Sequence, residues 1–370
     1  MDKMGIVYED LLIIFGVHYI TVLTFAFIGA TIVEKLISRD GLLSIWILLG
    51  TIFSTFMALL ESNNLSDLCL VSFLLGIALG FGFPNCLAYF ADAVNNIGSR
   101  GKSGGIALFV AHLGMLLVGF LTNVLSFVAA VLVFTTWRAV GLIAFQIAKY
   151  RKYNIKKEIT KVRYQHIVSE RPFILYFVPW VMFCLVNFLE YPLQQYHWGI
   201  ETSNAVSTAE FGIASFAALI GGYFADVVGR KRLLILGYVL LGIGYAVLSI
   251  FPTNQISITI YTVFDGVAWG LFALIFFLII WGDLANNRAK DKYYLLGALP
   301  FLLSSYVSVI VVPLVKLIDM STSFSLASFF LFLAVVPLMY APETLPEKKI
   351  RERELKSYVE KAKKIREKFT

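Results

Sequence analysis

The sequence predicts an all-α, polytopic membrane protein of about eleven transmembrane helices arranged in two lobes. The 370 residues are 59% hydrophobic and only 15% charged, which is more apolar than a water-soluble chain of this length. Apolar stretches recur along the chain, each close to the roughly 20 residues that cross a hydrocarbon core about 30 Å thick. Lysine and arginine gather in the breaks between these stretches, as expected of loops at a membrane surface.

Five apolar stretches make up the first lobe. The first is too long for the core of a signal peptide, and Glu34 follows it where a cleavage site would need small residues, so we expect it to remain as a helix. The predicted spans are residues 11–33, 42–60, 68–91, 104–125 and 129–149.

A basic linker separates these spans from six more. Between Lys149 and Arg171 the chain carries eight basic residues and two acidic ones, so we expect this segment to lie outside the bilayer. The second set of spans is 173–190, 206–225, 233–251, 256–282, 293–316 and 323–340. The predicted division is a first lobe at 1–149, a linker at 150–172, a second lobe at 173–341 and a tail at 342–370.

Basic residues predict the orientation of the spans. With eleven spans, 28 of the 31 lysines and arginines fall on one side of the membrane, and basic residues near span ends are retained in the cytoplasm. We therefore expect an external amino terminus and a cytoplasmic carboxyl terminus in the plasma membrane. The tail spaces apolar residues along one stripe from 350 to 369, which predicts an amphipathic helix that binds anionic lipid.

The two halves resemble each other at a fixed offset. A shift of 192 residues aligns Gly29–Arg39 with Gly221–Lys231, matching glycine, acid and base. A shift of 191 aligns Asp92 with Asp283 and the asparagines that follow each. Under this register the first half starts at the counterpart of the second half's second helix, so the first lobe lacks an opening helix.

A loop motif gives the most specific local signal. Residues 222–232 read GYFADVVGRKR, in which Gly222 permits close helix approach, Asp226 can accept hydrogen bonds at a helix end, and Gly229 permits a tight turn before Arg230 and Lys231. Together with the span count, the basic linker and the repeat, this loop resembles the signature loop of the major facilitator superfamily. The resemblance implies a conformational latch in this loop, with Glu34 and Arg39 in the corresponding first-lobe loop.

The sequence also departs from the family pattern. Glu34 and Ile37 replace the aspartate and second glycine of the first-lobe loop, and Ser72 replaces the arginine of the fourth-helix motif. Val118 and Gly119 stand where the antiporter fifth-helix motif has Gly-Pro. Residues 342–344 read PET, which is similar to the end of sugar porters but too short to assign a sugar.

The resemblance implies a secondary transporter that moves a small solute, with or without a coupling ion, by alternating access. The alternative is a transport-inactive or truncated derivative that acts as a sensor or interaction partner, because a missing helix removes one wall of the path. We expect no enzyme activity, since the four histidines have no catalytic or metal-type spacing. No cofactor, metal or nucleic acid is predicted, and the three cysteines are interpreted as small hydrophobic residues.

Four polar or aromatic residues within spans are the candidates for the solute path. Asp265 leads because a charged residue within a span usually faces a cavity or a partner, and Trp269 lies one turn further along. The other two, His112 and Asn187, could equally form hydrogen bonds between helices, and Asp265 could do the same. For Arg138, beside Trp137, we favour an external interfacial position at the start of a late-beginning helix.

Overall fold

The computed structural model describes residues 7–35, 38–62, 64–94, 99–150, 162–285 and 289–345. Within these ranges the protein is helical, and eleven helices are long and apolar enough to cross a membrane. The predicted number of spans is therefore confirmed. The predicted amphipathic helix at 350–369 and residues 151–161 of the basic linker lie outside the described residues.

The first lobe contains five spans. Its third span is broken by Gly82 and Pro84, where one helix ends and the next begins. The helices are α1 (Tyr8–Lys35), α2 (Arg39–Thr55) with a 3-10 turn at Phe56–Ser62, α3 (Leu65–Gly80) with α4 (Phe83–Ala93), α5 (Arg100–Val124) and α6 (Phe127–Tyr150).

The second lobe contains six spans and a short helix that precedes them. Its fourth span widens into a π-helical segment between two α-helical parts, and this places Asp283 near the end of the span. The helices are α7 (Tyr164–Ser169), α8 (Arg171–Trp198), α9 (Ile200–Val227), α10 (Arg230–Ile250), α11 (Gln255–Phe272) with η2 (Ala273–Ile279) and α12 (Ile280–Ala285), α13 (Lys290–Val311) with η3 (Val312–Leu317), and α14 (Met320–Tyr340).

The packing of the lobes repeats, as the sequence offset predicts. In the first lobe α1 packs on α3 and α2 on α6, and in the second lobe α9 packs on α11 and α10 on α14. Across the lobes, α5 packs on α9 and α1 packs on α13, which are equivalent contacts under the repeat. Within the described residues, α8 has no counterpart in the first lobe, whereas each of the other long helices of the second lobe has one.

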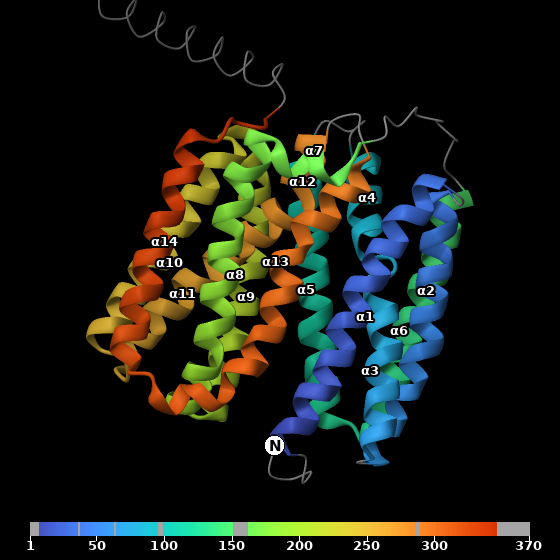
Figure 1. Ribbon diagram of the computed structural model, residues 1–370, viewed down its shortest axis with the longest axis horizontal. Coiled ribbons are helices and arrows are strands. Elements are labelled where there is room, and N and C mark those ends of the chain that lie inside the picture. The colour runs from blue at the N-terminus through green and yellow to red at the C-terminus, as the bar shows by residue number, and fades with distance from the viewer. Residues whose placement is uncertain are drawn as a thin grey trace, which may run out of the picture.

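The ends of the bundle differ in charge. One end carries the α1–α2, α9–α10 and α13-side loops in which the sequence concentrates its basic residues, and we call it the basic end. Figure 1 shows α4, α7 and α12 gathered at this end, whereas α1 begins at the opposite end. At the basic end, both lobes therefore present charged side chains that can pair across their interface.

The largest apolar core lies in the second lobe. Trp180 and Phe183 of α8 stack at 5.6 Å between ring centroids, and Trp180 stacks on Phe276 of η2 at 4.6 Å. All three rings are at most 1% exposed. Burial of such large side chains contributes about 1.5–3 kcal/mol each, so this core holds α8 and the fourth span of the lobe in fixed positions.

Candidate functional site

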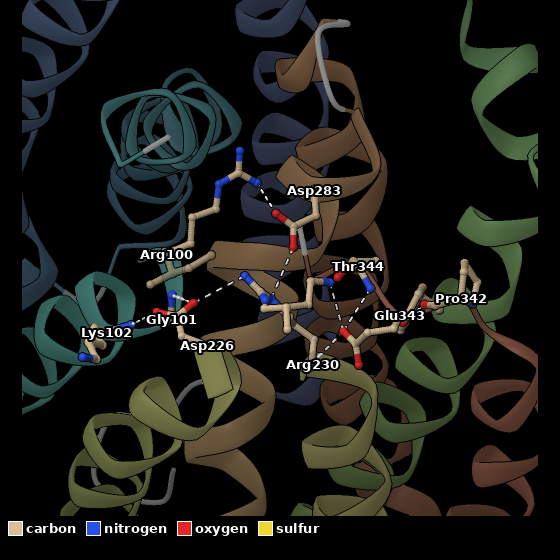
Figure 2. Close-up of polar contacts among 12 residues, drawn as sticks. Arg100, Gly101, Lys102, Asp226, Arg230, Asp283, Pro342, Glu343 and Thr344 are labelled. Carbon is tan, nitrogen blue, oxygen red and sulfur yellow. Dashed lines mark hydrogen bonds and ion pairs between the residues drawn. The ribbon is translucent and has the colours of Figure 1, made fainter. Parts of the chain in front are cut away.

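Asp226 links the two lobes at the basic end. Its carboxylate, near the end of α9, accepts hydrogen bonds from the backbone N–H groups of Gly101 (3.1 Å) and Lys102 (3.0 Å) in the first turn of α5. Figure 2 shows this contact beside the other polar residues of the region. These N–H groups have no partner inside their own helix, and the positive end of the helix dipole favours an anion there. A side chain of the second lobe thus caps a helix of the first.

Close backbone contact makes this cap possible. A Cβ added to Gly222 would collide with the carbonyl oxygen of Gly101, and one added to Gly101 would collide with that of Gly222. Both helices therefore approach backbone to backbone just before Asp226, as small residues allow. Gly222 permits close helix approach, as predicted, and the helix that approaches it is α5 of the other lobe.

Arg230 and Asp283 extend the contact. Arg230 is 1% exposed and lies 3.5 Å from Asp226 and 3.4 Å from Asp283. Arg100, at the start of α5, forms an ion pair with Asp283 across the lobes. Because these charges are buried, each depends on its partner, since an unpaired buried charge costs several kcal/mol.

A second group of charges bridges the lobes through α2 and α13. Arg39 of α2 pairs with Asp92 of α4 and with Asp291 of α13, while Lys290 of α13 pairs with Asp92. Arg39 and Asp92 belong to the first lobe, whereas Lys290 and Asp291 belong to the second. We call the two groups together the inter-lobe charge cluster, which consists of Arg39, Asp92, Arg100, Asp226, Arg230, Asp283, Lys290 and Asp291.

The turn after α9 is fixed from within the second lobe. Gly229 has φ +112°, a conformation that favours glycine, and Glu343 accepts a hydrogen bond from the backbone N–H of Arg230 at 3.0 Å. Lys231 donates to the carbonyl oxygens of Met339 and Ala341. Gly229 and Lys231 therefore hold the loop against the end of α14, and the glutamate of the PET sequence is part of this contact.

Sequence reasoning found only part of this cluster. It singled out Asp226, Arg230 and Arg39, but it did not find Arg100, Lys290 or Asp291, which supply the opposing charges. These residues lie at the start of α5 and α13. In the sequence they look like the charged residues that commonly flank the ends of spans at a membrane surface. Glu34 lies in α1, and its side chain is outside the described residues.

Two of the predicted path residues meet. The indole N–H of Trp269 donates to the side-chain oxygen of Asn187 at 3.2 Å, and both residues are half-buried. Phe301 of α13 lies edge-on to Trp269 with 6.3 Å between ring centroids. Asn187 and Trp269 thus form one polar pair on α8 and α11, framed by an aromatic ring.

The other two predicted path residues lie elsewhere. Asp265 is 2% exposed and accepts a hydrogen bond from Tyr261 at 3.1 Å, inside the second lobe. His112 of α5 lies edge-on to Phe211 of α9, with 5.7 Å between ring centroids, at the contact between lobes. The four candidates therefore do not form a single site.

The interfacial position favoured for Arg138 is wrong. Helix α6 begins at Phe127 rather than at Trp137, so Arg138 lies near the middle of a full span. Its guanidinium packs against Gly50 of α2, where the absence of a side chain makes room for it. The predicted span at 129–149 agrees with this helix, so the error lay in the late helix start assumed for Arg138.

Comparisons with known proteins place the fold. No protein-family model matches the chain, and no curated protein matches its sequence. Solved structures do match. A proton:xylose symporter aligns over 92% of this chain and 89% of its own at 14% identity and a TM-score of 0.64. The fucose:proton symporter of E. coli aligns over 92% of both chains at 12% identity and a TM-score of 0.69.

A third match is a bacterial homologue of the iron transporter ferroportin in its outward-facing state, with 90% of both chains covered, 12% identity and a TM-score of 0.71. The eleven apolar helices and the two repeated lobes define a multi-pass helical membrane protein. Its fold is that of the major facilitator superfamily, as the resemblance of the loop motif predicts.

Proposed function

We propose that the protein is a secondary transporter that moves a small solute between its two lobes by alternating access. The observation that carries this proposal is the inter-lobe charge cluster, which joins separately packed lobes through polar contacts at one end of the bundle. Polar contacts between rigid bodies can break and re-form at moderate cost, unlike a continuous apolar core. The fold similarity to solute transporters supports the same function.

The cluster is the gate of this transporter at its cytoplasmic side. The assignment of the basic end to the cytoplasm rests on the distribution of lysine and arginine along the sequence. In the structure this end is closed, which agrees with similarity to a protein in an outward-facing state. Opening requires Asp226 to leave the α5 terminus and the pairs of Arg39 and Arg100 to separate.

The Asn187–Trp269 pair is the candidate contact for the solute. An amide and an indole offer hydrogen bonds and an aromatic face without a fixed charge. Both belong to helices of the second lobe, and their half-buried state leaves polar groups that a solute could reach. This arrangement suits a polar, uncharged small molecule better than an ion.

Distance measurements between spin labels test the alternating-access proposal. In a protein whose native Cys69, Cys86 and Cys184 are replaced by alanine, labels at Gln146→Cys and Arg232→Cys report the basic end. Labels at Ser66→Cys and Thr253→Cys report the opposite end. We expect two distance populations at each end, with the long distance at one end accompanying the short distance at the other.

The same preparation identifies the solute. Panels of sugars, amino acids and organic cations are added to labelled protein in nanodiscs, and compounds that change the populations are then tested for uptake into proteoliposomes. A single, unchanging distance at both ends under every condition would contradict the proposal and favour a transport-inactive protein. A matched control is the Asp319→Ala protein, because Asp319 caps α14 at an exposed position far from the cluster.

A further inference from the structure

Helix α8 covers one face of the second lobe, and no described helix covers the equivalent face of the first. Figure 1 shows α8 between α13 and α14, and it packs on both. Trp180 of α8 donates to the carbonyl oxygen of Gly297 in α13 at 2.8 Å, and Glu190 of α8 accepts from Ser323 of α14 at 2.6 Å. In the first lobe the equivalents of α13 and α14 are α5 and α6, which therefore lack such a cover.

The repeat identifies the residues of α5 that are left uncovered. The shift of 191 residues aligns Ile106 of α5 with Gly297 of α13, and Leu113 with Ser304. Gly297 is buried and Ser304 is 3% exposed, whereas Ile106 and Leu113 are 56% and 42% exposed. Helix α5 thus exposes the face that its counterpart buries.

The register between α6 and α14 follows from a pair of glycines. The shift of 192 residues aligns Gly50 of α2 with Gly242 of α10. A Cβ added to Gly50 would meet Arg138 of α6, and one added to Gly242 would meet Phe332 of α14. Arg138 and Phe332 therefore hold equivalent positions, which sets a shift of 194 residues between these two helices.

Helix α6 also exposes positions that its counterpart buries. Under this register Trp137 and Val140 of α6 correspond to Leu331 and Ala334 of α14. Leu331 and Ala334 are both 0% exposed, whereas Trp137 is 56% and Val140 is 57% exposed. The two uncovered helices thus present one continuous apolar surface, because Trp137 also contacts α5 at Gly114, where an added Cβ would lie 3.2 Å from the indole ring.

Trp137 carries a polar group at an unfavourable depth. It lies midway along α6, whereas tryptophan in membrane proteins is concentrated at the two interfaces with water. Its indole N–H has no hydrogen-bond partner among the described residues, and the indole nitrogen is a donor only. Lipid tails offer no acceptor, so an acceptor at this depth has to come from another protein segment.

A space for such a segment lies beside Trp137. Gly141 follows one turn later on α6, and a Cβ added there would meet no atom within 4 Å. Small residues let the backbone of a second helix approach closely within a membrane. We call this surface the α5–α6 face, which consists of Ile106, Val110, Leu113, Trp137, Val140 and Gly141.

We propose that the α5–α6 face binds one transmembrane helix of a partner protein, in the position that α8 takes in the second lobe. The face has no charged residue, so the helix that fits it is apolar over about 20 residues and carries an asparagine or glutamine near its middle to accept from Trp137. The 370 residues contain no further apolar stretch of that length. Each span of a second copy is already packed on neighbours in its own lobe. The proposal does not depend on transport activity.

Cross-linking to a model helix tests the proposal. The probe is a leucine–alanine peptide of membrane-spanning length with a central asparagine next to one cysteine. It is reconstituted into liposomes with the full chain, in which Cys69, Cys86 and Cys184 are replaced by alanine. Cross-linking to Val140→Cys should saturate as the peptide is increased. At the control position Phe329→Cys, which is 59% exposed midway along α14, it should rise only in proportion to peptide density.

Two variants test the details of the contact. Trp137→Phe should weaken binding of the asparagine peptide by about threefold to thirtyfold, and should not affect a peptide with leucine in its place. Gly141→Leu fills the space beside Trp137 and should block both peptides without a change in melting. Gly212→Leu is its matched control, because Gly212 of α9 also has no atom within 4 Å of an added Cβ. If Gly141→Leu does not fold, Val140→Trp at an exposed position provides the same test.

Three results would overturn the proposal. Cross-linking that is unsaturable at both positions would show that the α5–α6 face contacts lipid alone. A disulfide between two copies of Val140→Cys in the absence of peptide would show that a second copy covers the face. Saturable binding that survives both Gly141→Leu and Val140→Trp would place the helix elsewhere. The spin-label experiments on alternating access do not involve this face, so failure of the transport proposal is recognised separately.

Discussion

Replacement of Asp226 by alanine is expected to open the basic end. The change removes the two hydrogen bonds from α5 backbone N–H groups and leaves Arg230 with Asp283 as its remaining partner. Hydrogen bonds to a charged group contribute about 1.5–3 kcal/mol each, and the helix dipole adds up to about 1 kcal/mol at a typical site.

Only part of this energy distinguishes the closed state from the open one. The contact between Asp226 and Arg230 lies within the second lobe and persists when the lobes separate, whereas the bonds to Gly101 and Lys102 do not. Water also replaces part of the lost hydrogen bonding. We therefore expect Asp226→Ala to weaken the closed state by about 2–4 kcal/mol, since the two inter-lobe bonds are charge-assisted. This corresponds to a fall of about 25- to 700-fold in the ratio of closed to open protein.

The measurement uses the spin-label pair at the basic end, with the pair at the opposite end reporting the reciprocal change. Asp319→Ala is the matched control, because it removes an exposed carboxylate that caps α14 and should leave both distance distributions as in the wild type. Melting of the variant in nanodiscs should stay close to the wild type. An Asp226→Ala protein with unchanged distances, or one that loses its fold while the control does not, would refute the gating role of this residue.

Three further predictions concern the gate, the solute contact and the topology. Gly222→Ala should favour the open basic end, because its Cβ collides with the Gly101 carbonyl, whereas Gly212→Ala on the same helix meets no atom within 4 Å and should have no effect on spin-label distances. Trp269→Phe removes the hydrogen bond to Asn187, which contributes about 0.5–1.5 kcal/mol, and should change the KM for the identified solute by up to about tenfold while melting stays nearly constant. Reporter fusions should place the amino terminus outside and the carboxyl terminus in the cytoplasm; two cytoplasmic signals would contradict the eleven-span topology.

The sequence by itself determined the class of fold. Span number follows from apolar length, because the thickness of a bilayer sets the length of every helix that crosses it. The offset between Asp92 and Asp283 already indicated the repeat, and the structure places these residues at equivalent ends of α4 and α12. These features are local or periodic, so a linear pattern suffices to predict them.

Only the tertiary structure decided which residues meet. The motif around Asp226 predicted a helix-end contact, but the partner is α5 of the other lobe. Gly101 of α5 lies 125 residues from Asp226 in the chain. Arg138 was misplaced because a linear pattern does not show that Gly50 makes room for it. Asp265 looked solitary in its helix, yet α9 packs against the next residue, Gly266, with the backbone carbonyl of Glu210 beside it. Hydrophobic patterning shows that a residue lies within the membrane. The rotation of its helix and the docking of the lobes decide which other side chain lies opposite that residue.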